Sequence, residues 1–308
     1  HVGWLPTTLW GPIATAAACG RLLHLDERRA AHAFGFAYAQ IHGNRQALVD
    51  GALAKRIQPG FSAAAGLKAA LYAASGLTAA GRIIDGEFGI PALYTRGRLD
   101  RSFLADGIGE DYQTSQISIK PYPSCRCSHP VIDAALELKE RHALDPADIR
   151  GGEILLPPQS MGQIGQPFRI RDNPTVDAQF SAQFTAALAL LRGRPRIRDF
   201  GREAVRGAAE VIELAGRFTA VVFEKQSPTL TPVEVRITTR SGRTVQTRVE
   251  HPKGSPANPL ERRELMAKLD DCLDTSRNRF AAEHRKRLAE ALFGIIDLDD
   301  VTAIFDMV

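Results

Sequence analysis

Small and apolar residues recur at helical spacing along the first third of the chain. The segment 9–25 is rich in alanine, the best helix former. Asp26 is a typical N-cap residue, so a second helix is expected over 27–39. A third helix is expected over 62–75, where apolar positions repeat every three or four residues and Gly76 marks the end. So many alanines and glycines predict helices that approach one another closely, as in a compact bundle.

The middle of the chain mixes strand and helix patterns. Pro121 and Pro123 force an extended path after the first alternating segment, and Ser241-Gly242 separates the last two as in a hairpin. Strand patterns occupy 116–120, 152–156, 233–239 and 243–249. Helical patterns occupy 128–144, 175–191 and 201–215. This part of the chain is therefore expected to form a small α+β domain.

The tail from Pro259 onward is helical again, which gives the order helical, α+β, helical. That order is typical of a helical domain interrupted by an inserted one. We therefore predict a mainly α fold with an inserted α+β domain. The predicted segments are 1–112 for the helical domain, 113–251 for the α+β domain and 252–308 for the return to the helical domain.

Composition and charge exclude several classes of protein. With 44% hydrophobic and 24% charged residues, the 308-residue chain is neither collagen-like nor a coiled coil nor disordered. No apolar run approaches the roughly 18 residues of a membrane span, and no signal peptide is visible. Basic residues exceed acidic ones by only four and are not interleaved with aromatics, so no nucleic-acid partner is expected. Four cysteines are too few for a disulfide scaffold and favour the cytoplasm.

Motifs for cofactors and metals are weak. No glycine-rich phosphate loop stands between a strand and a helix, so no nucleotide cofactor is expected. Cys125-Arg126-Cys127 with His129 forms the single Cys/His cluster, and three ligands at such cramped spacing are a poor zinc site. The predictions are therefore no cofactor and no metal.

Two lysines stand next to chain breakers. Lys55 precedes Pro59-Gly60, and Lys120 directly precedes Pro121, with Arg126 a few residues further on. A lysine at a rigid bend beside an arginine can hold a carboxylate, or can lose its proton readily when it is buried. For an isolated lysine, a solvated surface residue is the simpler interpretation. Spacing alone does not identify an enzyme here.

At these residues the sequence resembles the MmgE/PrpD family, which includes 2-methylcitrate dehydratases, cis-aconitate decarboxylases and iminodisuccinate epimerases. Each motif alone is weak, but together they run through nearly the whole chain in the family's order. They are Gly3-Trp4-Leu5-Pro6-Thr7, Ala54-Lys55 through Gly66, Lys120-Pro121-Tyr122-Pro123-Ser124-Cys125-Arg126 with His129, Arg171 through Ser181, and Lys253-Gly254-Ser255-Pro256 with Asn258-Pro259.

The resemblance implies a fold and a chemistry. Family members have a large helical domain and a smaller α+β lid, in a homodimer, with the site between domain and lid and with neither metal nor organic cofactor. Their substrates are small polycarboxylates. The shared reaction removes a proton beside a carboxylate, and then water or carbon dioxide is lost or the carbon is reprotonated. A lyase or isomerase of a small di- or tricarboxylate is therefore expected.

The resemblance also implies site residues. Lys55 and Lys120 match the cations that hold carboxylates and stabilise enolate-like charge, and Arg126 stands where it can assist them. Cys125 and His129 are the other candidate catalytic residues. The base is expected to be His42, His129 or Cys125, or to come from an N-terminal part that this chain lacks or from a second chain. His42 and Ser181 are the remaining candidate substrate-binding residues.

Two positions depart from the family pattern. Leu5 stands where the family usually has a histidine base, and Phe184 stands where many members have a tyrosine. Neither side chain can transfer a proton. The alternative expectation is thus a diverged non-catalytic or partner-dependent subunit. The start at His1 suggests that about a hundred or more residues of helical domain are supplied by a separate N-terminal fragment or subunit, or have been removed.

Overall fold

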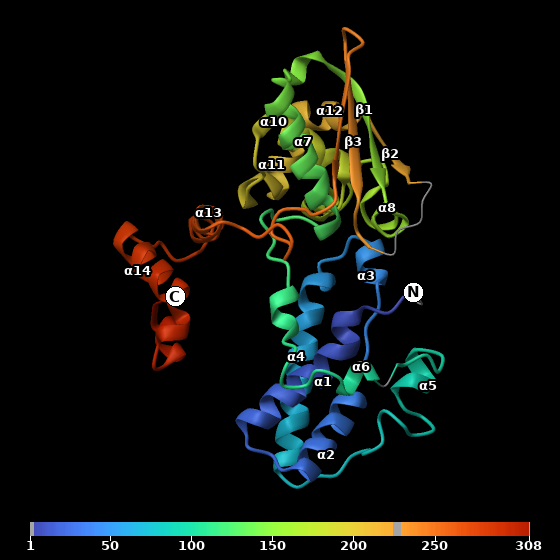
Figure 1. The fold of residues 1–308 in the computed structure, drawn as a ribbon, viewed down its shortest axis with the longest axis vertical. Helices are drawn as coiled ribbons and strands as arrows, with labels where there is room; N and C mark the ends of the chain where they lie inside the picture. Colours follow the sequence, from blue (N-terminus) through green and yellow to red (C-terminus); the bar gives the residue numbers. More distant parts are fainter. Residues whose placement is uncertain (1–2, 101, 224–228, 308) are drawn as a thin grey trace. The chain divides into compact units, whose positions relative to one another are not determined.

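The computed structural model describes residues 3–100, 102–223 and 229–307. The chain divides into two compact units, His1–Tyr112 and Gln113–Val308, hereafter the N-terminal and C-terminal units. The fold is mainly α-helical with one small four-stranded sheet (Figure 1). No helix in the described ranges combines the length and apolarity needed to cross a bilayer.

Three helices form the body of the N-terminal unit: α1 (Pro6–Leu22), α2 (Glu27–Tyr38) and α4 (Ala54–Ala74). Small residues let their backbones approach closely. A Cβ atom on Gly66 of α4 would lie 2.5 Å from the Pro12 carbonyl oxygen of α1. The core between the helices is largely alanine, namely Ala16, Ala33, Ala37, Ala69 and Ala73. The predicted close-packed bundle is confirmed for these three helices.

The sequence predicts α2 better than it predicts α4. The Asp26 carboxylate accepts the Arg29 N–H at 2.8 Å, which is the expected N-cap. By contrast, α4 begins at Ala54, so the predicted break at Pro59-Gly60 is wrong. Pro59 is the sixth residue of α4 and lies inside the helix, so α4 continues through it although the missing N–H removes one hydrogen bond of the helix. The shorter helices of this unit are α3 (Gln46–Val49), α5 (Ile90–Tyr94) and α6 (Ser102–Ala105).

One side of α4 carries exposed apolar side chains. They recur at helical spacing, so they form a stripe along the helix. The members are Ile57, Phe61, Leu67, Leu71 and Tyr72, hereafter the α4 stripe.

The C-terminal unit is built on a mixed sheet of order β2-β1-β3-β4. The strands are β1 (Ile149–Leu156), β2 (Phe218–Val222), β3 (Val233–Thr239) and β4 (Thr244–Val249). β2 is parallel to β1, and the other pairs are antiparallel. The predicted hairpin is confirmed as β3 and β4, whereas β2 was not predicted. The predicted strand at 116–120 is wrong, because its segment follows a 3₁₀ turn (Gln113–Gln116) and pairs with no strand.

Helices cover one face of this sheet. α7 (His129–His142) packs on β3 and β4, and α10 (Ala182–Arg192) packs on α7 and α12 (Ala209–Ala215) (Figure 1). The predicted helix 175–191 is two helices, because Ser181 N-caps α10 after α9 (Pro174–Gln179) ends. The predicted helix 201–215 likewise divides into α11 (Arg202–Arg206) and α12. α8 (Pro158–Ile164) follows β1.

The tail contains α13 (Arg262–Asp274) and α14 (Ala282–Phe293). The Asp271 carboxylate on α13 accepts the Ile197 N–H at 2.9 Å. Glu264 pairs with Lys253 at 3.0 Å. The sequence assigns 252–308 to the helical domain, whereas the structure groups these residues with the C-terminal unit.

Two segments of the C-terminal unit cross at Gly254. The Ile119 N–H donates to the Gly254 carbonyl at 2.8 Å. Gly254 has φ +80°, and a Cβ atom there would lie 2.0 Å from the Ile119 carbonyl oxygen. Only glycine tolerates both the left-handed backbone and this approach. The crossing therefore explains the glycine of the Lys253–Pro256 motif.

Replacing this glycine should test the crossing. Gly254→Ala adds left-handed strain of about 1–2 kcal/mol and a backbone clash of similar size, so we expect a loss of about 3 kcal/mol in unfolding free energy, measured by urea denaturation. Gly242→Ala is the matched control, since Gly242 has φ +85° but nothing within 4 Å of its Cβ position. Equal losses in the two variants would show that the crossing contributes nothing.

Candidate functional site

A cavity of about 510 Å³ lies within the C-terminal unit. Two stretches of chain supply most of its walls: residues 118–126, hereafter the Lys120 loop, and residues 250–257, hereafter the Ser255 loop. The structure thus brings the predicted residues Lys120 and Arg126 to one cavity. Ser118, His251 and Ser255 line it as well.

Arg126 brings a positive charge that has little compensation. Its Nη2 donates to Ser118 Oγ at 3.5 Å, while its Nη1 is buried without a hydrogen-bond partner. Burial lowers the pKa of Arg126, and the Asp133 charge offsets part of this shift. The guanidinium nevertheless stays charged at neutral pH. Among the described residues no carboxylate forms an ion pair with it. A buried charge of this kind is stabilised by a bound anion.

Other buried polar atoms near this charge also lack partners. Ser255 Oγ is one of them, and both ring nitrogens of His129 are others. Lys120 Nζ donates to the Ser124 carbonyl at 3.2 Å. Unsatisfied polar atoms of this kind are rare in folded proteins. Here they accumulate beside two cations, which is the donor set that a carboxylate ligand requires.

His129 is fully buried at the start of α7, with its ring edge against Tyr122 at a centroid distance of 5.3 Å. Burial, followed by the charges of Arg126 and Lys120, lowers the pKa of His129 to about 3. The Ser124 backbone offsets only part of this, because no hydrogen bond of normal geometry joins it to the ring. The imidazole is therefore neutral at pH 7 and a weak base.

Asp133 connects the two loops. Its Oδ1 accepts the Tyr122 hydroxyl at 2.7 Å, and its Oδ2 accepts the Lys253 N–H at 2.8 Å. Burial raises the pKa of Asp133, although these donors and Arg126 oppose the shift. Burial and the nearby carboxylate raise the pKa of Tyr122, so its hydroxyl stays protonated.

The predicted residue Cys125 is buried beside Cys127. The Cys125 N–H donates to the Gln179 carbonyl at 2.9 Å, and its Sγ lies 3.9 Å from Gln163 Oε1. A hydrogen bond with Cys125 and burial raise the pKa of Cys127, so that thiol is protonated at neutral pH. None of the four cysteines, which all lie in the described ranges, forms a disulfide. In the part of the chain that is described, no group of three His, Cys, Asp or Glu side chains could hold a metal ion.

Ser181 and Phe184 lie away from the cavity lining. Ser181 Oγ accepts the Phe184 N–H at 3.1 Å and is the N-cap of α10. The Phe184 ring is fully buried and packs on Phe168 at a centroid distance of 4.7 Å. Phe184 thus belongs to the core of the C-terminal unit.

The remaining candidates lie in the N-terminal unit. Lys55 is the second residue of α4, and one turn later Gln58 Nε2 donates to the Asn44 carbonyl at 3.2 Å. Trp4 forms a β-bridge with Asn44, next to the exposed His42. The structure thus joins the Leu5, His42 and Lys55 segments within this unit. Lys120 belongs to the other unit, so a shared site for the two lysines stays a prediction.

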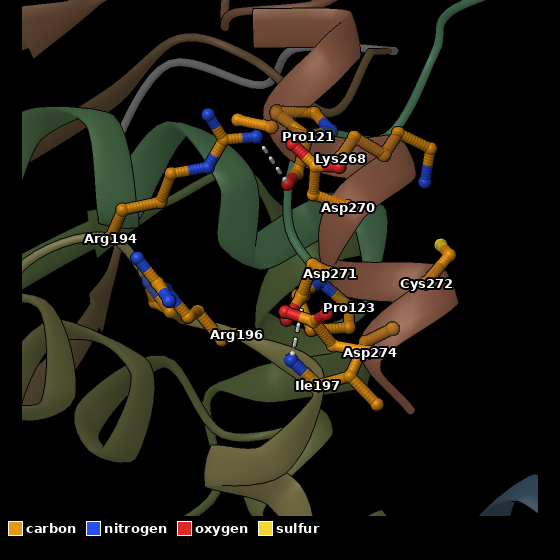
Figure 2. Close-up of a pocket in the computed structure, with 12 residues that line it drawn as sticks. Pro121, Pro123, Arg194, Arg196, Ile197, Lys268, Asp270, Asp271, Cys272 and Asp274 are labelled. Carbon is orange, nitrogen blue, oxygen red and sulfur yellow. Dashed lines mark hydrogen bonds between the residues drawn. The ribbon is translucent and has the colours of Figure 1, made fainter. Parts of the chain in front are cut away.

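A second cavity, of about 310 Å³, lies on the α13 side of Pro121 and Pro123 (Figure 2). Figure 2 shows the hydrogen bond, 3.3 Å long, from Arg194 Nη2 to the Pro121 carbonyl. The charged residues of this lining balance in number: Arg194, Arg196 and Lys268 against Asp270, Asp271 and Asp274. Among the described residues that line the first cavity, Glu250 alone has a carboxylate, and it already pairs with Arg248. The first cavity is therefore the better anion site.

Some groups around the first cavity have no recognisable signal in the sequence. Ser118, His251 and Asp133 were not proposed, and Ser255 appeared only within a motif. The spacing of the Lys253–Pro256 motif could have indicated a second wall, but its partner loop lies more than a hundred residues earlier in the chain.

Comparison with known proteins defines the class. The MmgE/PrpD N-terminal domain matches residues 1–101, and the MmgE/PrpD C-terminal domain matches residues 122–293. The chain belongs to the MmgE/PrpD family, and its two units fit the family's two-domain architecture. The family resemblance found in the sequence is confirmed.

Particular relatives include lyases. The chain is 25% identical over 321 residues to a cis-aconitate decarboxylase of Aspergillus terreus, covering 99% of this chain and 64% of that protein. It is 26% identical over 322 residues to a cis-aconitate decarboxylase-like protein, oryM, of Aspergillus oryzae, covering 99% and 65%. The chain thus spans less than two thirds of the length of these relatives.

The low pKa of His129 should appear in the acid stability of the protein. Since that pKa lies below its ordinary value of 6.5, the unfolded chain takes up a proton at His129 that the folded chain does not. The resulting stability is complete above pH 6.5 and is lost as the pH falls toward 3. As the pH falls from 6.5 to 4.5, the unfolding free energy of the wild type should drop by about 2–3 kcal/mol more than that of His129→Phe.

Urea denaturation across this pH range provides the measurement. Val131→Ala, a cavity-forming change on the same helix, should lower stability equally at each pH and leave the slope unchanged. A wild-type slope in His129→Phe would contradict the buried neutral imidazole.

Proposed function

We propose that this protein is a cofactor-independent lyase or isomerase that acts on a small di- or tricarboxylate by removing a proton next to a carboxylate. The observation that carries the proposal is the first cavity, where Lys120 and Arg126 meet and buried polar atoms of Arg126 and Ser255 have no partner. Family membership and the decarboxylase relatives support the same chemistry.

In this proposal Lys120 and Arg126 bind one carboxylate of the substrate. Loss of a proton from the adjacent carbon sends the electron pair onto that carboxylate, which then carries enolate-like charge. The two cations stabilise this charge more than the ground state, so they lower the barrier. In a dehydration the hydroxyl group on the neighbouring carbon takes up a proton and leaves as water, and in an epimerisation a proton returns to the same carbon. In a decarboxylation the removed proton is returned to the carbon skeleton, the bond to a carboxylate then breaks to release carbon dioxide, and a proton from solvent takes up the electron pair of that bond.

Lys55 is proposed as the second cation, for a further carboxylate of the substrate. Candidates for the base are His42, His129 and Cys125. The low pKa of His129 makes it a weak base at neutral pH, whereas His42 is exposed in the N-terminal unit beside the segment that carries Leu5. Among the three, His42 thus fits the role of base best. Ser181 is the N-cap of α10, and we propose that it contributes to the site indirectly, by stabilising this helix.

The proposed partners are the polycarboxylate and a second polypeptide, either another copy in a homodimer or a separate N-terminal fragment or subunit. The α4 stripe supports association, since a soluble monomer rarely leaves several large apolar side chains uncovered on one helix. The four free cysteines support a cytoplasmic location.

The second candidate function is a diverged subunit that binds the anion without turning it over. Leu5 favours the diverged subunit, because it occupies the position of the family's usual base. In this structure Leu5 is the N-cap residue of α1. Binding and turnover must therefore be measured separately.

Lys120→Ala should abolish turnover. We expect kcat/KM for cis-aconitate to fall at least about a hundredfold, because one stabilising cation is lost. Carbon dioxide release and proton NMR of the products monitor the reaction, with 2-methylcitrate as the alternative substrate. Lys286→Ala, which removes an exposed lysine of α14, should match the wild type.

Calorimetric titration with tricarballylate separates the two candidates. Turnover that is lost in Lys120→Ala supports the enzyme, and wild-type binding without turnover supports the diverged subunit. Unchanged turnover in Lys120→Ala, or no binding by the wild type, would remove the carboxylate site.

A further inference from the structure

Asp133 makes one hydrogen bond to each wall of the first cavity. On the Lys120 loop its partner is the Tyr122 hydroxyl at 2.7 Å, and on the Ser255 loop it is the Lys253 N–H at 2.8 Å. Asp133 itself stands on α7, whose neighbouring residues Val131 and Ile132 are fully buried in the core. The carboxylate is therefore a fixed point between two segments that carry no regular strand or long helix.

We propose that Asp133 is a positioning residue, which sets the separation of Lys120 and Arg126 on one loop from Ser255 on the other. This inference rests on the proposed function, because it concerns the same carboxylate-binding cavity. Asp133 is absent from the cavity lining, so it acts through the groups it holds.

A carboxylate suits this position for a geometric reason. The two donors approach different oxygens, Oδ1 and Oδ2. An asparagine side chain has a single acceptor oxygen, and its amide group would face one of the donors. The backbone N–H of Lys253 cannot reverse its role, so the asparagine oxygen must face it and the Tyr122 hydroxyl must accept from the amide. Both connections weaken in Asp133→Asn, because hydrogen bonds to a carboxylate are replaced by neutral ones.

Charge alone makes the opposite prediction. A negative group close to Arg126 opposes the binding of an anion, so its neutralisation would tighten binding if Asp133 acted only through its field. If Asp133 acts by holding the loops, neutralisation weakens binding. A role limited to overall stability leaves the affinity unchanged well below the unfolding temperature. The sign of the change in affinity therefore separates the three roles.

Calorimetric titration of the full chain with tricarballylate at 20 °C tests the inference. We expect about tenfold weaker binding in Asp133→Asn, because two hydrogen bonds to a carboxylate become weaker neutral ones. Tyr122→Phe removes only the link to the Lys120 loop and should weaken binding by about threefold. The control is Glu137→Gln, one turn later on α7, where Glu137 accepts the Thr247 hydroxyl of β4 at 3.0 Å and should leave the affinity unchanged.

The outcomes distinguish the two proposals. Wild-type protein that fails to bind tricarballylate contradicts the proposed function. Wild-type binding with equal or tighter binding by Asp133→Asn overturns the positioning role and leaves the proposed function standing. If Asp133→Asn does not fold, Tyr122→Phe decides, because wild-type affinity in that variant would mean that the link to the Lys120 loop does not shape the site.

Discussion

The crossing of the Lys120 loop and the Ser255 loop is the constraint on which the C-terminal unit's cavity depends. Neither loop has a strand or long helix to hold it, so a backbone hydrogen bond at Gly254 and the two bonds of Asp133 define their separation. Arg126 on the Lys120 loop is half-buried, and no carboxylate among the described residues forms an ion pair with it. The electrostatic character of the cavity therefore follows from backbone geometry.

The same charge affects the other groups around it. Arg126 and Lys120 help to keep His129 neutral, and Arg126 opposes the rise that burial causes in the pKa of Asp133. Protonated Tyr122 and Cys127 remain hydrogen-bond donors. Lys120 and Arg126 line the cavity, and Glu250, which lines it as well, already pairs with Arg248. Such an arrangement favours binding of an anion over proton transfer by these particular side chains.

Local sequence signals predicted local structure well. The Asp26 cap and the hairpin at Ser241-Gly242 need only neighbouring residues, and both are present. Some predictions from the sequence were wrong because contacts between residues far apart in the chain determine the local structure there. The segment 116–120 has a strand pattern, but its Ile119 N–H bonds to Gly254. Lys120 and Arg126 were predicted because they share a motif with the family, whereas Asp133 and Ser255 join them only through the fold, and a single sequence carries no record of that proximity.

The hydrogen bond between Asp133 and the Lys253 N–H closes a loop of 120 residues. On the ribosome, the segment with Lys120 emerges first, and the sheet and its covering helices follow before Lys253 appears. The cavity consequently has one wall throughout the synthesis of the intervening polypeptide. A nascent chain that stops within β4 would already have its sheet, yet it would lack any enclosed space for a metabolite. The cavity thus acquires its second wall after the sheet has been made and before α13 and α14.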